Sequence, residues 1–210
     1  MNFNDDIMLE ILHIVDIKTL QQMCFVNKTC LSYCLSSFFW KRKMNEKGFI
    51  YKQGNTFKEW INHYNKSVTD YQNTYYILKI NQIEYQRLNT TKYDIYLDSR
   101  VLYMSEIIKL FPHELIKHMQ FKNTYFLWIK YIKENLYDVS MGFNDNYTFI
   151  DTLHYDIVFN IIYQFIYQYG TELVSDEYGN LFIQDETSML KNSLSARRLG
   201  ILDCLRLKLI

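Results

Sequence analysis

Residues 3–41 constrain the fold more than any other part of the chain, because their apolar side chains recur at helical spacing. The three- and four-residue steps of an amphipathic helix connect Ile7, Met8, Ile11, Leu12 and Val15. Asp5 and Asp6 stand at the start of this helix, where carboxylates interact favourably with the free amides and the positive end of the dipole. An amphipathic helix is therefore predicted at the beginning of the chain.

Polar residues divide the rest of this stretch into further short helices. Asp16 is a candidate cap for a second helix, and Asn27 marks the next bend. The second helix carries Leu20 and Met23, and the third carries Cys30, Leu31, Cys34 and Leu35. Ser36 and Ser37 are predicted to end the third helix, so that the aromatic residues 38–40 fold back as a lid. Three short helices with one small shared core are expected.

The composition favours a packed protein with no nucleic-acid partner. Hydrophobic residues make up 49% of the 210 residues, which is enough for a sizeable core. Lys and Arg together number 23, as do Asp and Glu, so the formal net charge is zero. Nucleic-acid binders usually carry a basic excess that neutralises phosphates, and this chain has none.

Neither a secretory signal nor a membrane span is expected. The acidic N-terminus lacks the basic and then apolar layout of a signal peptide. The most hydrophobic later run, 157–169, is interrupted by Asn160, Gln164 and Gln168 and falls short of the roughly 20 apolar residues of a span. A soluble protein in a reducing compartment is expected, with its four cysteines as thiols.

A fourth helix and a domain boundary are predicted next along the chain. Thr56 and Glu59 have the spacing of a capping box. The buried stripe of the helix that follows would contain Phe57, Trp60, Ile61 and Tyr64. The polar run 65–73 is interpreted as a linker, which divides the chain into a module at 1–45, a helical extension and linker at 46–70, and a domain at 71–210.

The region after residue 70 is predicted to be mostly helical with a small β-hairpin, so the fold class is mainly α. Helices are expected at 75–88, 101–110, after Pro112, at 124–135 and near 156–169. The hairpin would join 173–175 to 181–183 through a turn that contains Gly179. Alternating leucines at 205–209 suggest one more strand.

No catalytic, metal or cofactor motif emerges from the sequence. His113 and His118 lie five residues apart, whereas a zinc-protease helix needs two histidines at i and i+4. Cys24, Cys30 and Cys34 lack a nearby fourth ligand and are better explained as core residues. The six glycines form no phosphate-binding loop, and nothing singles out a nucleophile. A non-enzymatic protein without a cofactor is expected.

Residues 3–41 resemble an F-box. Asp5-Asp6-Ile7-Met8 corresponds to the opening of that motif and Glu10-Ile11-Leu12 to its first helix. Val15-Asp16 with Leu20, Val26-Asn27-Lys28, and Trp40-Lys41 correspond to its later steps. The sequence departs from the family where Phe3-Asn4 replaces Leu-Pro and Ile17 replaces a second proline, and each missing proline removes a rigid turn.

This resemblance implies a substrate-recognition subunit of a cullin–RING ubiquitin ligase, located in the cytoplasm or nucleus. Its partners would be a Skp-type adaptor, bound by the N-terminal helices, and an unknown protein target, held by the region beyond residue 71. The adaptor-binding set implied is Phe3, Asn4, Ile7, Met8, Ile11, Leu12, Leu20, Val26 and Trp40. The composition, rich in Asn, Ile, Lys and Tyr, also resembles that of F-box proteins from large DNA viruses, which would place the protein in a host cell.

Two other functions remain open on the sequence. The same helices could belong to a non-catalytic structural or sequestering protein unrelated to ubiquitin. An enzyme built on 71–210 is a third option, since site residues can converge from distant positions, although no motif supports it.

Overall fold

The computed structural model describes residues 3–88, 94–98, 126–143, 146–169, 172–175, 181–184 and 197–198. Helices account for the larger share of the described secondary structure, so the chain is mainly helical, as predicted. The chain divides into two compact units, Met1–Tyr71 and Gln72–Ile210. None of the described helices is both long enough and apolar enough to cross a membrane.

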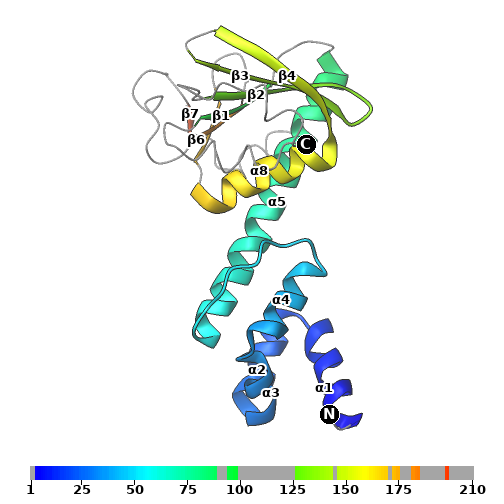
Figure 1. Cartoon of the computed structure of the whole chain (residues 1–210), viewed down its shortest axis with the longest axis vertical. Coiled ribbons are helices and arrows are strands. Elements are labelled where there is room, and N and C mark those ends of the chain that lie inside the picture. Colours follow the sequence, from blue (N-terminus) through cyan, green and yellow to red (C-terminus); the bar gives the residue numbers. More distant parts are fainter. Residues whose placement is uncertain are drawn as a thin grey trace. The chain divides into compact units, whose positions relative to one another are not determined.

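The first unit begins with the three predicted helices (Figure 1). They are α1 (Phe3–Ile14), α2 (Ile17–Val26) and α3 (Lys28–Cys34). Asp16 caps α2 by accepting a hydrogen bond from the Thr19 amide at 3.0 Å. Asn27 caps α3 in the same way, through the amides of Thr29 and Cys30. Both breaks are local, because a short polar side chain satisfies amides that have no partner within the helix.

The aromatic residues after α3 form a helix, so the predicted lid is wrong. Helix α4 (Ser37–Asn45) begins directly after Ser36 and carries Phe38, Phe39 and Trp40 in its first turns. Phe39 and Trp40 point into the core, while Phe38 is exposed. One helical face can bury only some of three consecutive side chains, because each residue turns the helix by roughly 100°.

Helix α5 (Phe57–Leu88) is 32 residues long and contains the segment predicted to be a linker. Its start is the predicted capping box, in which Thr56 Oγ1 accepts a hydrogen bond from the Glu59 amide at 3.2 Å. The helix continues through 65–73, where Ser67 and Asp70 occupy buried positions, and Thr74 is buried directly after this segment. The predicted helix at 75–88 is the last part of α5 and is confirmed.

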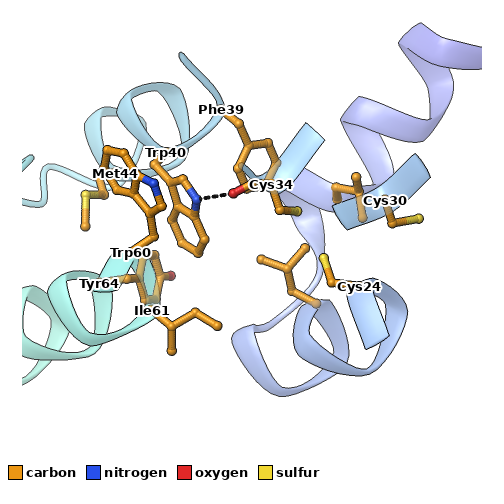
Figure 2. Packing of buried hydrophobic residues seen from close by; sticks show 11 residues of the cluster. Cys24, Cys30, Cys34, Phe39, Trp40, Met44, Trp60, Ile61 and Tyr64 are labelled. Atoms are coloured by element: carbon orange, nitrogen blue, oxygen red, sulfur yellow. Dashed lines mark hydrogen bonds between the residues drawn. The ribbon is translucent and has the colours of Figure 1, made fainter. Parts of the chain in front are cut away.

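The core of the first unit is built from side chains of all five helices (Figure 2). Its buried members are Leu12, Leu20, Cys24, Cys30, Cys34, Phe39, Trp40, Met44, Trp60, Ile61 and Tyr64. The three cysteines are buried among apolar side chains, which confirms their predicted packing role. Burial also raises the pKa of the Cys24 thiol, so the thiol stays protonated at neutral pH.

The second unit contains a seven-stranded sheet, which is larger than the predicted hairpin (Figure 1). The strand order is β4-β3-β2-β1-β6-β5-β7. The strands are β1 (Ile95–Asp98), β2 (Phe126–Lys133), β3 (Leu136–Phe143), β4 (Asn146–His154), β5 (Glu172–Ser175), β6 (Leu181–Gln184) and β7 (Arg197–Arg198). All neighbours pair antiparallel except β1 and β6, which are parallel.

The helix predicted at 124–135 is wrong, because 126–133 form β2. Leu127, Ile129 and Tyr131 are buried, whereas Trp128 and Lys130 between them are only partly buried. This alternation has the period of a strand, and aromatic and β-branched residues favour that conformation. The strand pairing of the expected hairpin is confirmed, since β5 pairs antiparallel with β6 in the register Leu173↔Ile183. The predicted turn with Gly179 lies outside the described residues.

Helix α8 (Tyr155–Tyr169) follows β4 directly and matches the helix predicted near 156–169. Its buried face, which includes Val158, Ile161, Ile162 and Phe165, recurs at three- and four-residue steps. The predictions for 101–110, for the segment after Pro112, for His113 and His118, and for a strand at 205–209 fall outside the described residues.

Candidate protein-docking surface

Helix α1 carries three exposed isoleucines on one face. Ile7, Ile11 and Ile14 lie at i, i+4 and i+7, and 46%, 41% and 79% of their surfaces are exposed. Residues at these steps lie on one side of a helix, so the three side chains form a continuous row. We call this row the apolar stripe. The opposite side of α1 faces the core through Leu12, which is fully buried.

A second exposed apolar group lies where α2 ends. Phe25 is 93% exposed and Val26 is 81% exposed, and we call them the α2-end pair. They are the last two residues of α2, directly before Asn27, which ends α2 and caps α3. Leu35 and Phe38, on either side of the break between α3 and α4, are exposed as well. A row of large exposed apolar side chains, such as the apolar stripe, is typical of a protein-binding surface.

Trp40 holds the core beneath these helices together. Its indole Nε1 donates a hydrogen bond to the backbone carbonyl oxygen of Cys34 at 2.7 Å, the dashed line in Figure 2. Its ring lies parallel to that of Trp60, with 6.0 Å between the ring centroids and 5° between the planes. Trp40 therefore connects the end of α3 to α5.

A buried lysine connects α4 to the end of α1. The Lys43 ammonium donates to the carbonyl oxygens of Leu12, His13 and Val15 at 3.1, 2.8 and 2.9 Å. Carbonyls at the end of a helix lack partners within it and carry partial negative charge, so an ammonium is well suited to this place. Burial lowers the pKa of Lys43 to about 8, which leaves the side chain charged at neutral pH.

His13 occupies the same end of α1 and is 6% exposed. Its ring packs on Phe39 with 4.6 Å between the ring centroids. Its Nδ1 is buried, and none of the described residues forms a hydrogen bond with it. Burial and the nearby positive charge of Arg42 lower the pKa of His13, so the imidazole is neutral at pH 7. Arg42 itself bonds Glu10 of α1 at 2.7 Å, which adds an exposed ion pair between α1 and α4.

The predicted adaptor-binding residues separate into two groups. Leu12, Leu20 and Trp40 are fully buried and belong to the core. Ile7, Ile11 and Val26 are exposed, and Met8 is partly buried against the core. Phe3 and Asn4 lie in α1, and their side chains are outside the described part of the chain. The two groups were combined in the prediction because apolar periodicity does not distinguish the two sides of a helix that packs on one side and binds on the other.

Sequence reasoning missed four exposed apolar residues, Ile14, Phe25, Leu35 and Phe38. Ile14 continues the helical spacing of Ile7 and Ile11, so the periodicity alone could have included it. Phe25 precedes the predicted Val26 directly. The exposure of Leu35 and Phe38 depends on the end of α3, which was predicted at Ser36 and Ser37, and on the start of α4, which was not predicted.

The described part of the second unit contains one enclosed carboxylate. Asp94 is buried, and its Oδ2 accepts a hydrogen bond from Trp128 Nε1 at 2.8 Å. Burial raises the pKa of Asp94 to about 6. Within the described residues, no three His, Cys, Asp or Glu side chains are grouped so that they could hold a metal ion.

No family model, curated protein or solved structure matches the chain in comparisons with known proteins.

Proposed function

We propose that the protein is a substrate-recognition subunit of a cullin–RING ubiquitin ligase that works in the cytoplasm or nucleus. Its first unit docks on a Skp-type adaptor, and its second unit holds the protein target. One observation carries the proposal: the five residues of the apolar stripe and the α2-end pair are exposed on α1 and α2, whereas other side chains of these two helices are buried in the core. The F-box resemblance of 3–41 supplies the identity of the partner.

The apolar stripe and the α2-end pair provide the driving force for docking. Complete burial of an exposed aliphatic or aromatic side chain contributes about 1.5–3 kcal/mol. In the chain alone, Ile14, Phe25 and Val26 have not gained most of this burial free energy, because most of each side chain contacts solvent. A partner that covers these residues recovers it, less the free energy lost when two molecules associate.

Leu12, Leu20 and Trp40 have a different part in the proposal. They form the core from which α1 and α2 present their exposed side chains. Rigid presentation favours binding because little side-chain and backbone entropy is lost on association.

The proposed receptor acts by proximity. It brings a target lysine close to the ubiquitin-conjugating enzyme and supplies no catalytic group.

Co-purification of the full chain with a Skp-type adaptor tests the proposal. Wild type should retain the adaptor, and the double variant Ile7→Asp, Ile11→Asp should lose it, because two carboxylates would be buried unpaired. The variant Asn62→Asp, Asn65→Asp is the matched control, since both residues are exposed on α5. Leu12 is unsuitable for this test, because an aspartate in its buried position would unfold the unit.

The non-catalytic sequestering alternative gives a different result. A sequestering protein would bind its partner without promoting its turnover, whereas a ligase receptor shortens the lifetime of a bound target. A wild-type chain that retains no Skp-type adaptor would refute the ligase proposal.

A further inference from the structure

The two ends of the seven-stranded sheet differ in length and in charge. At one end lies β7, which has two residues, both arginines. At the other end lies β4, which has nine residues and no Lys, Arg or Pro. Short length and positive charge are devices that keep an edge strand from pairing with another chain. β7 has both devices, and β4 has neither.

Strand β4 uses only one of its two hydrogen-bonding sides within the described residues. It pairs antiparallel with β3 from Asn146↔Phe143 to His154↔Leu136, and no described strand lies beyond it (Figure 1). In an antiparallel sheet, alternate residues direct their N–H and C=O groups to opposite sides of the strand. About half of the backbone groups of β4 therefore point away from β3, and an extended backbone has the geometry to bond them.

The side chains along β4 also suit a bound strand. Phe149 is 58% exposed, and Thr148 and Thr152 are exposed as well. An extended segment that lies beside β4 would contact such side chains as cross-strand neighbours. The register shift between Val139 and Ser140 places one extra residue, Ile150, in β4. A bulge of this kind bends the strand and is itself a device that limits edge pairing, so an added strand would pair with one of the two regular stretches on either side of it.

The charge near the C-terminal end of β4 indicates what kind of segment fits. Asp151 lies in β4, where its Oδ1 accepts a hydrogen bond from the Thr152 amide at 2.8 Å. Asp156 follows in the first turn of α8 with its side chain 81% exposed, and its Oδ2 lies 3.3 Å from Nδ1 of His154 in β4. Neither β4 nor the first turn of α8 carries a lysine or arginine. A strand with a basic residue near Asp151 would therefore gain favourable electrostatic interactions, whereas an acidic strand would be repelled.

We propose that β4 binds an extended, basic segment of a protein partner by strand addition. This inference goes beyond adaptor docking. If the partner is the ligase target, the inference rests on the proposed function. The binding of an extended peptide to β4 does not depend on ubiquitin.

Amide hydrogen exchange of the full chain provides the first test. Amides of β4 that point away from β3 should exchange fast, in alternation with protected amides that bond β3. Thr152 is left out of this comparison, because its amide donates a hydrogen bond to Asp151 Oδ1 at 2.8 Å. Protection of all β4 amides in the chain alone would overturn the proposal, because another segment or a second copy of the chain would then cover the edge.

Selection from a phage-displayed library of peptides of about ten residues provides the second test. Selected peptides should carry Lys or Arg and should slow the exchange of the outward-facing β4 amides. The variant Thr148→Lys, Phe149→Lys should bind them at least about tenfold more weakly, because lysine discourages pairing at an edge. The matched control Gln72→Lys, Asn160→Lys adds the same charge at exposed helical positions and should bind like wild type.

Two further measurements keep the outcomes distinct. The unfolding midpoint of the Thr148→Lys, Phe149→Lys variant should equal that of wild type, and Thr148→Lys alone replaces it if the pair unfolds. The Ile7→Asp, Ile11→Asp variant should still bind the peptides, so failure of adaptor docking and failure of strand addition are separable. Peptides that protect no β4 amide, or that bind the edge variant as tightly as wild type, would overturn the proposal.

Discussion

The ammonium of Lys43 lies 2.8 Å from the backbone carbonyl oxygen of His13 and bonds two further carbonyls at the end of α1. Together with the buried Leu12 and the ion pair of Glu10 with Arg42, this side chain holds the helix that carries the apolar stripe against the rest of the first unit. The position of the stripe thus depends on a polar contact beneath it as well as on apolar packing.

Replacement of Lys43 by methionine should destabilise the first unit by about 2–4 kcal/mol, because each buried carbonyl left without a partner costs about 1–3 kcal/mol. Methionine has a similar length and keeps most of the packing. Urea unfolding followed by tryptophan fluorescence measures the change. Lys41→Met, at an exposed position of α4, is the control and should leave the midpoint unchanged.

His13 should make the first unit less stable in mild acid. Burial and Arg42 lower its pKa below the usual 6.5, so the unfolded chain binds a proton more readily than the folded one. The stability that neutral His13 provides is complete above about pH 6.5 and is lost as the pH falls through the lowered folded pKa. His13→Leu should reduce this loss between neutral pH and pH 5 in thermal unfolding.

Part of the acid sensitivity should remain in His13→Leu. The pKa of His63 is also lowered, mainly by burial, and its contribution has the same sign. His63→Leu together with His13→Leu should flatten the profile further. An unchanged slope in the double variant would contradict the assignment to these histidines.

Trp40→Phe should destabilise the first unit by about 2–4 kcal/mol. The substitution removes the hydrogen bond to the Cys34 carbonyl and opens a cavity beside Trp60. Phe38→Ala, at an exposed position in the same helix, should change stability little. Equal effects of the two substitutions in chemical unfolding would contradict the core described around Trp40.

Asp94→Asn should stabilise the second unit at pH 7 by about 2–3 kcal/mol, from the difference between its folded and unfolded pKa values. Burial raises the folded pKa to about 6 from 3.8, so the folded state loses stability as the pH rises through that interval. Asparagine removes the buried charge and keeps an oxygen for the Trp128 N–H. Thermal unfolding at pH 5 and 7 measures the effect, with the exposed Glu134→Gln as control.

Helices α1, α2 and α3 were predictable because their limits are set locally. Asp16 and Asn27 cap the following helices through side-chain contacts two or three residues away, and such contacts are visible as sequence spacing. Helix α8 was predictable for a related reason, since its buried face has a regular period. These signals need no knowledge of the rest of the fold.

The segments 65–73 and 124–135 were misjudged because their partners lie far away in sequence. Ser67 is polar yet buried in α5, and its hydroxyl donates to the carbonyl of Ile50 at 3.3 Å. In 126–133 the dense apolar pattern also fitted a buried helix, and only pairing with β1 and β3 identifies a strand. The division of the candidate site into core and exposed residues depends on tertiary packing for the same reason.

Titration calorimetry of the full chain with a Skp-type adaptor tests the central claim most directly. Wild type should bind with a Kd of about 1 μM or tighter, and Ile7→Asp, Ile11→Asp should raise the Kd at least about a hundredfold. The Asn62→Asp, Asn65→Asp control should keep the wild-type Kd. Absence of heat of binding for wild type, or equal affinity for both double variants, would contradict the claim that the exposed side chains of α1 dock an adaptor.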